Sequence, residues 1–194
     1  NDFMWRYDMR RLSAEEIRDS ILNLTDKLNL KMGGPSIYTE VPRDVLATAS
    51  RPGGAWGNSS EEDRNRRSVY IFVKRSLHEP FLSAFDWADT DNTCDVRFVT
   101  TVPTQTLTLM NSKFLNDSAE TLAKHVAEVA PGDATAQIRH ALHKATHRKP
   151  TDEEVQDGLD LIKELKEKTD ASQEDAMQRF CLLVLNLNEF LYLD

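Results

Sequence analysis

The stretch of sequence that decides the fold begins with Thr101-Val102-Pro103-Thr104-Gln105-Thr106-Leu107-Thr108-Leu109-Met110. From here on, apolar residues recur three and four positions apart, which is the spacing of one face of an α-helix. The recurring residues are Leu107, Met110, Phe114 and Leu115, then Ala119, Leu122, Ala123, Val126 and Val129. Pro131-Gly132 ends this run. The second half of the chain is therefore predicted to be helical.

Capping residues predict three more helices after this turn. Asp133 suits the start of one helix, Thr151 and Glu154 form a capping box for a second, and Asp170 or Ser172 begins a third. The third helix is apolar nearly all round, so we expect it at the centre of the core. Its polar residues Asn186, Asn188 and Glu189 are expected to bond to residues 33–63 or 100–106.

The first helix is predicted from another capping box, Ser13 with Glu16. An apolar stripe follows at Ile17, Ile21, Leu24 and Leu28, and Gly33-Gly34-Pro35 is expected to stop the helix. Residues 33–63 are rich in proline and glycine, and only a short helix near residues 42–49 is expected there.

A small β element is predicted between these helical parts. Residues 68–74 are rich in β-branched and aromatic side chains, and residues 96–101 are a natural partner strand. The fold class is thus mainly α, a helical domain with a two-stranded β element. A short helix is expected at residues 81–85.

The overall composition limits the function classes. The chain has 194 residues, 40% of them hydrophobic, which suits one domain over residues 1–194, with two lobes as an option. The formal net charge of -8 argues against a general nucleic-acid binder, which needs a basic surface. No apolar run approaches the roughly 18 residues of a membrane helix, so no membrane span is predicted.

Charged residues are concentrated around the predicted β element. A basic cluster is followed by an acidic loop, and together they are a candidate site for an anionic ligand, because arginine forks match carboxylate and sulfate geometry. The candidate binding residues are Arg66, Arg67, Lys74, Arg75, Asp86, Asp89, Asp91 and Arg97. The alternative is that these charges have a structural role. The arginines, together with Arg64, would then form ion pairs with Glu61, Glu62, Asp63 and the loop aspartates.

Other constellations favour no catalytic or metal chemistry. The acidic loop lacks the glycine and the final glutamate of an EF-hand, so calcium is not predicted. His140, His143 and His147 have helical spacing, but the surrounding cations disfavour a divalent metal. Ser76, His78 and Glu79 are too close in sequence for a triad. We predict no metal site and no cofactor in this segment.

The two cysteines, Cys94 and Cys181, allow two interpretations. They are either two buried thiols or one long-range disulfide, which requires an oxidising compartment. They are too far apart in sequence for a metal-binding knuckle.

Several short motifs together resemble one family. These are residues 10–20, Gly33-Gly34-Pro35-Ser36, residues 66–70, Phe85-Asp86 with Ala88-Asp89-Thr90, residues 100–105 and Leu187-Asn188-Glu189-Phe190. In order and spacing they resemble the C-terminal domain of unknown function of large planctomycete-type secreted proteins, which often carry a cytochrome-c domain. The resemblance covers essentially the whole chain, and it carries over no catalytic residues.

The resemblance implies a context. The chain would be the C-terminal part of a longer, exported polypeptide, periplasmic or on the cell surface, which favours the disulfide between Cys94 and Cys181. Any haem would lie in an upstream domain. The expected function is a binding or interaction module for upstream domains of the same polypeptide or for an anionic polysaccharide. The alternative is a catalytic domain acting on polysaccharide, with Asp86, Asp89 and nearby arginines in its site.

Overall fold

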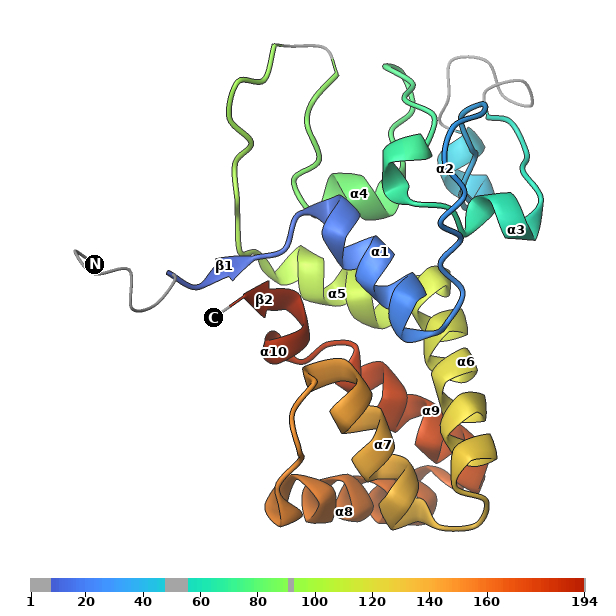
Figure 1. Cartoon of the computed structure of the whole chain (residues 1–194), viewed down its shortest axis with the longest axis vertical. Coiled ribbons are helices and arrows are strands. Elements are labelled where there is room, and N and C mark those ends of the chain that lie inside the picture. Colours follow the sequence, from blue (N-terminus) through green and yellow to red (C-terminus); the bar gives the residue numbers. More distant parts are fainter. Residues whose placement is uncertain (1–7, 48–55, 91–92, 194) are drawn as a thin grey trace. The chain divides into compact units, whose positions relative to one another are not determined.

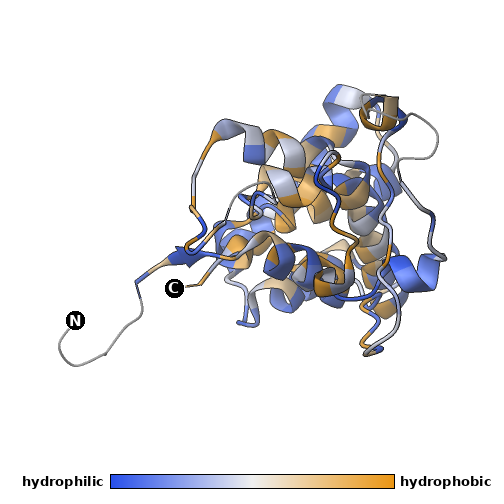
Figure 2. Ribbon diagram, turned by 90° about the horizontal axis from the view of Figure 1, so that it is seen from above, coloured by the Kyte–Doolittle hydropathy of each residue, from blue (hydrophilic) through white to orange (hydrophobic). Residues whose placement is uncertain are grey.

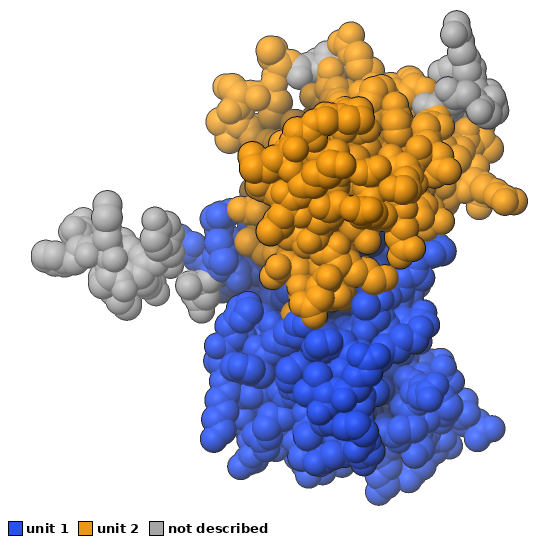
Figure 3. Space-filling model, turned by 45° about the vertical axis from the view of Figure 1, so that its right-hand side comes forward, with its two compact units in different colours: residues 1–11, 109–194 blue, residues 12–108 orange. Residues whose placement is uncertain are grey.

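The computed structural model describes residues 8–47, 56–90 and 93–193, and it confirms a mainly α fold with a small two-stranded sheet. The chain divides into two compact units, unit 1 with residues 1–11 and 109–194 and unit 2 with residues 12–108 (Figure 3). Figure 1 labels their helices and strands. The helices of both units carry apolar and polar residues side by side, as amphipathic helices do (Figure 2).

Unit 2 contains short helices joined by irregular segments. They are α1 (Ala14–Leu24), α2 (Arg43–Ala47), α3 (Glu61–Arg64), the 3-10 helix η1 (Ser68–Tyr70), α4 (Pro80–Ala84) and the first part of α5 (Pro103–Asn111). The predicted capping box of α1 is confirmed: Ser13 N donates to Glu16 Oε2 over 2.7 Å, and Glu16 N donates to Ser13 Oγ over 3.4 Å. The predicted helices near residues 42–49 and 81–85 correspond to α2 and α4, and residues 48 and 49 lie outside the described residues.

Helix α1 ends nine residues before the predicted stop at Gly33. Asp26 adopts a left-handed conformation with φ 56°. Its N–H donates to Asn23 O, and Lys27 N donates to Leu22 O, which is the bonding pattern of a Schellman motif. An aspartate in the usual glycine position ends the helix, and Leu28 therefore follows the helix rather than extending its stripe.

The predicted location of the β element was wrong. Residues 68–70 form η1, and the chain then makes a single parallel bridge from Ile71 to Ile37. Residues 96–101 belong to no strand. The reason is that Phe72 N donates to Ile37 O and Ile37 N donates to Tyr70 O, so the irregular segment takes up these backbone groups. The two-stranded sheet is instead antiparallel β1 (Arg10–Arg11) with β2 (Tyr192–Leu193), in unit 1.

Unit 1 is built from longer helices. They are α6 (Lys113–Val129), α7 (Ala134–Thr146), α8 (Asp152–Thr169), α9 (Gln173–Val184) and α10 (Asn188–Leu191). The predicted caps Asp133, Thr151 with Glu154, and Ser172 are confirmed. Helix α9 packs against α6, α7 and α8, and its buried face includes Met177, Phe180 and Cys181, so it is the central helix of this unit.

Two parts of the predicted apolar stripes lie at the surface. Leu107 and Met110 are exposed, and the buried apolar residue of α5 is Leu109. Val129, in the last turn of α6, is also exposed. The stripe of α6 from Leu115 to Val126 is buried as predicted. Val129 lies at a helix end, where the contacts that select a buried face are fewest, whereas Leu107 lies in the middle of α5.

Close packing in unit 1 depends on Gly158 in α8. A Cβ atom at this position would lie 2.9 Å from both Ile138 Cγ2 and Phe180 Cε2, which is too close for carbon atoms. We predict that Gly158→Val lowers the free energy of unfolding by about 1–3 kcal/mol through overpacking. Asp157→Val, at the exposed neighbouring position, is the control for the helix propensity of valine. Equal losses for both variants in urea unfolding would contradict this packing constraint.

Candidate functional site

The predicted site residues all belong to unit 2, but the structure separates them into several small clusters. Asp91 lies outside the described residues. Arg75 and Asp89 are exposed and Lys74 is half-buried. Arg66, Arg67, Asp86 and Arg97 bond to groups of the protein itself, and Lys74, Arg75 and Asp89 also have interaction partners in the protein. The polar chemistry predicted from sequence thus includes a large structural component.

Arg66 is the most buried of these residues, with an exposed fraction of 2%. Its guanidinium donates to Lys31 O over 3.3 Å, to Pro35 O over 3.2 Å and to Gly33 O. The guanidinium carbon also lies 3.9 Å from the centre of the Tyr70 ring, a cation–π contact. If the charges were structural, this arginine was expected to pair with carboxylates. In the structure its hydrogen-bond partners are backbone carbonyls instead.

The turn held by Arg66 uses two glycines in left-handed conformations. Gly33 has φ 76° and Gly34 has φ 87°, a region that side chains rarely adopt. Gly33 N donates to the Tyr70 hydroxyl over 2.8 Å. Residues 31–35 are therefore bound by both Arg66 and Tyr70, which explains why both occur in one of the motifs on which the resemblance rests.

A second buried arginine, Arg18, was not predicted as a site residue. It donates to Arg66 O over 3.1 Å, to Ser68 Oγ over 3.2 Å and to Arg64 O over 2.5 Å. Its neighbour Asp19 accepts from Ser68 N and Ser68 Oγ over 2.8 and 2.6 Å. Arg18 directly follows Ile17 on the buried face of α1, and that position was the signal available in the sequence.

Arg67 takes part only weakly in this network. Its Nε lies 3.9 Å from Asp19 Oδ2, and 53% of its side chain is exposed. An exposed ion pair of this length contributes little to stability. Arg67 and Arg66 are therefore neighbours in sequence with very different structural roles.

Glu79 is a buried carboxyl group in the same unit. Its Oε2 accepts from Leu82 N over 2.6 Å and so caps α4. Burial raises the pKa of Glu79, and the bond from Leu82 and the charge of Arg18 oppose that rise. Burial also lowers the pKa of Arg18. Since Glu79 is used as a helix cap, we assign it a structural role.

Asp86 organises the start of α5. With φ 62° it holds a left-handed conformation, and its carboxylate accepts from Thr100 N over 2.9 Å and Thr100 Oγ1 over 2.8 Å. Gln105 Nε2 donates to the same carboxylate over 3.3 Å. Gln105 is buried, and its Oε1 accepts from Val102 N. These bonds account for the two motifs at residues 85–86 and 100–105.

Arg97 and Trp87 share one acceptor, Glu15. Arg97 Nη1 lies 2.8 Å from both carboxylate oxygens, and Trp87 Nε1 donates to Oε1 over 3.0 Å. The bond to Glu15 raises the pKa of Arg97. Arg97 was expected to pair with the loop aspartates; its carboxylate partner is on α1 instead. The pair links the loop after α4 to the first helix of the unit.

The predicted histidines and cysteines do not form a metal site with three or more ligands among the described residues. In the described part of the chain, no group of three or more histidine, cysteine, aspartate or glutamate side chains is arranged to hold a metal. His143 Nδ1 lies 2.9 Å from Arg148 O, and His147 ends α7 in a left-handed conformation.

Cys94 is exposed, Cys181 is buried, and both are free thiols in the structure. Burial raises the pKa of Cys181 to about 12.

Asn186 and Glu189 have side-chain partners within unit 1, which corrects the expectation that they bond to residues 33–63 or 100–106. Asn186 Nδ2 donates to Leu182 O over 2.7 Å. Glu189 and Glu154 both accept from Arg148, so that α10 is joined to the start of α8. Glu154 has a pKa lowered to about 2 by this arginine.

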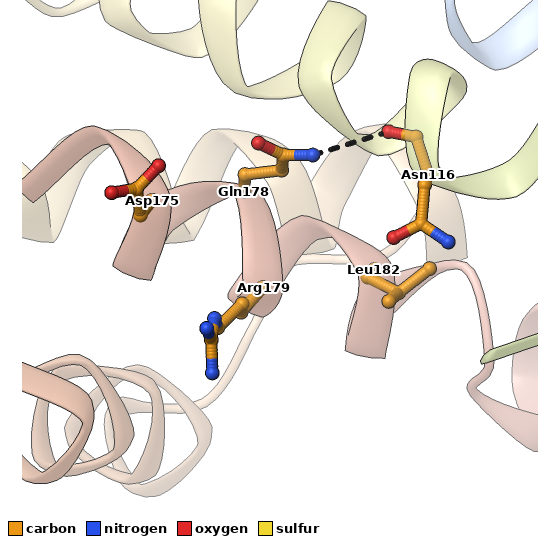
Figure 4. A pocket seen from close by; sticks show the side chains of 5 residues that line it. All are labelled: Asn116, Asp175, Gln178, Arg179 and Leu182. Carbon is orange, nitrogen blue, oxygen red and sulfur yellow. Dashed lines mark hydrogen bonds between the residues drawn. The ribbon is translucent and has the colours of Figure 1, made fainter. Parts of the chain in front are cut away.

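A small hollow lies on unit 1 between α6 and α9. Its volume is about 250 Å³, and it is lined by Asn116, Asp175, Gln178, Arg179 and Leu182. Figure 4 shows these side chains and the bond from Gln178 Nε2 to Asn116 O, 3.4 Å long. The volume falls below the roughly 300–1,000 Å³ of typical ligand pockets, and we assign the hollow no chemistry.

The fold and its polar clusters define a helical scaffold with internally bonded charges. The chain belongs to the family PSD1, described as a protein of unknown function (DUF1553), whose family model matches residues 1–162. No curated protein and no solved structure matches the chain. No helix among the described residues is long and apolar enough to cross a membrane.

Removal of the Arg66 guanidinium should destabilise unit 2. We predict that Arg66→Met lowers the free energy of unfolding by about 2–4 kcal/mol, because three carbonyls lose a charged donor. Arg67→Met, at the half-exposed neighbour, should change it by less than about 0.5 kcal/mol. Urea unfolding measures both. A loss for Arg66→Met no larger than that of its control would contradict the assigned role.

Burial of Glu79 should make stability depend on pH. The folded state holds the Glu79 proton to higher pH than the unfolded state, so the resulting stabilisation is complete below the ordinary pKa of 4.5 and is lost as pH rises above it. Glu79→Gln keeps an oxygen to cap α4 and cannot ionise. We therefore expect the stability of Glu79→Gln relative to the unmodified protein to increase as pH rises above 4.5. A difference in unfolding free energy between the two proteins that does not change with pH would contradict this assignment.

Proposed function

We propose that this chain is a protein-interaction module of an exported, cytochrome-c-associated polypeptide, and that its docking element is residues 96–102. The observation that carries the proposal is the exposure of apolar side chains in this segment. Val96, Phe98, Val99 and Val102 are exposed by 74%, 83%, 66% and 40%. Contiguous exposed apolar residues are typical of interaction surfaces.

The backbone of this segment supports docking by strand addition. The chain from residue 93 to α5 runs as an extended arm (Figure 1). The backbone groups of Phe98 and Val99 make no hydrogen bond to another described residue. A strand from a partner can be added to such a segment, because it bonds to the free backbone donors and acceptors and contacts the β-branched and aromatic side chains.

Both ends of the segment are held in place. Arg97 is bound to Glu15, and Thr100 is bound to Asp86. An element that is ordered before binding loses less conformational entropy on association. The polar clusters described above thus support the proposal by presenting the apolar residues in one conformation. The partner we propose is an upstream domain of the same polypeptide, where any haem would also reside.

An anionic polysaccharide is the alternative ligand. Of the residues proposed for it, Arg75 and Asp89 are exposed and Lys74 is half-buried. Arg66 is buried and donates its hydrogen bonds to backbone carbonyls. The cations of a glycan site would therefore be Lys74 and Arg75. An enzyme acting on polysaccharide would need Asp86 in an open cleft, and its carboxylate is bonded to Thr100 and Gln105.

Hydrogen exchange tests the docking element. We expect the amides of residues 96–99 to exchange rapidly in this chain alone and at least about tenfold more slowly in the longer polypeptide, where the added strand bonds them. Phe98→Asp should abolish that protection, because it places a charge in an apolar contact. Equally rapid exchange in both contexts would overturn the proposal.

Val69→Asp is the matched control for this experiment. Val69 is 71% exposed and belongs to the same unit, but it lies outside the segment. The protection of residues 96–99 should survive this change. Binding of a sulfated polysaccharide that is lost on Arg75→Ala and unaffected by Phe98→Asp would favour the glycan ligand instead.

A further inference from the structure

Two histidines of unit 1 face each other across a helix pair. His125 lies on α6 and His140 on α7, and their Nε2 atoms are 3.4 Å apart. The ring centroids are 5.4 Å apart, and the rings are tilted by 35°. The two helices are joined by a short turn at Pro131-Gly132-Asp133. His125 lies seven residues before Gly132 and His140 eight residues after it, so the antiparallel pairing brings them together.

The separation of the two nitrogens suits a shared metal ion better than a shared proton. A good hydrogen bond to nitrogen is about 2.7–3.2 Å long, and 3.4 Å exceeds this. With Zn–N bonds of about 2.0–2.1 Å, nitrogens 3.4 Å apart subtend about 110° at the metal, close to a tetrahedral angle. A square-planar ion with bonds of that length would need the nitrogens about 2.8–3.0 Å apart.

We infer that His125 and His140 form a binding site for a divalent zinc ion, with water in the remaining positions. The site goes beyond the proposed docking function and belongs to unit 1 rather than unit 2. Its ligands are on two helices, so the ion joins α6 to α7. The connection is already ordered, since Gln137 Nε2 donates to Ala130 O over 2.8 Å and Gly132 forms the turn. Such preorganisation favours metal binding.

Lys144 modulates this site. Its Nζ lies 3.5 Å from His125 Nε2, one helical turn after His140 on the same face. The ammonium group repels a cation and competes for the same lone pair. Metal binding therefore requires the flexible lysine side chain to turn away, and removal of its charge should strengthen binding.

Zinc titration of the whole chain tests the site, in a Cys94→Ser background so that the exposed thiol does not bind the ion. We expect saturable binding of one Zn²⁺ by calorimetry and a rise in the thermal midpoint of unfolding. His125→Gln and His140→Gln should each weaken binding at least about tenfold, since even substitutions outside the first ligand shell cost that much. Lys144→Met should strengthen it.

The double variant His143→Gln with His147→Gln is the control. Both histidines are exposed and lie on or at the end of α7, outside the proposed pair. Binding that persists in this variant and is lost in His140→Gln confirms the site. Absence of saturable binding to a folded protein, or binding that is lost in the control variant instead, overturns it. Circular dichroism establishes that each variant is folded.

Discussion

The irregular part of unit 2 depends on one interaction, the guanidinium of Arg66 bound to the carbonyls of residues 31, 33 and 35. A long segment without regular helices or strands leaves many backbone groups unpaired, and each one that is buried without a partner is costly. A planar cation with several fixed donors can satisfy several carbonyls at once, which lysine cannot do in the same geometry. Arg18 repeats this solution by binding the carbonyls of residues 64 and 66. The two arginines therefore do for this segment what a ladder of backbone bonds does in a sheet.

This arrangement explains which parts of the structure the sequence predicted. Helices with predicted caps, such as α1, α7 and α8, have starts specified by local chemistry, and their stripes are buried nearly as expected. The end of α1 was missed because Asp26 takes a left-handed conformation that usually requires glycine or asparagine. The β element was misplaced because β propensity at residues 68–74 is a weak local preference, and distant partners decide pairing. Ile37 provided one such partner, and the arginine network fixed the chain beside it.

The candidate site was predicted in composition but not in role. The charges of residues 64–97 are divided among several small clusters, and the sequence does not tell whether an arginine faces solvent or backbone. Arg66 and Arg67 are adjacent and chemically identical, and only the tertiary fold buries one of them. Arg18 lies beside the predicted apolar stripe of α1, but neither its position nor that of Glu79 tells which groups of the protein these charges bind. Only long-range contacts, such as those of Arg18 with Ser68, reveal them.

The same logic connects the polar clusters to the exposed segment at residues 96–102. Keeping Phe98 in water is unfavourable, since burial of such a side chain contributes about 1.5–3 kcal/mol. An unconstrained loop would be expected to turn that side chain inward, against its own unit. Glu15 and Asp86 oppose this by fixing Arg97 and Thr100 on either side of it. Anchors that hold an apolar side chain outward are useful if another surface covers that side chain. The internally bonded charges of unit 2 are therefore linked to a role in binding.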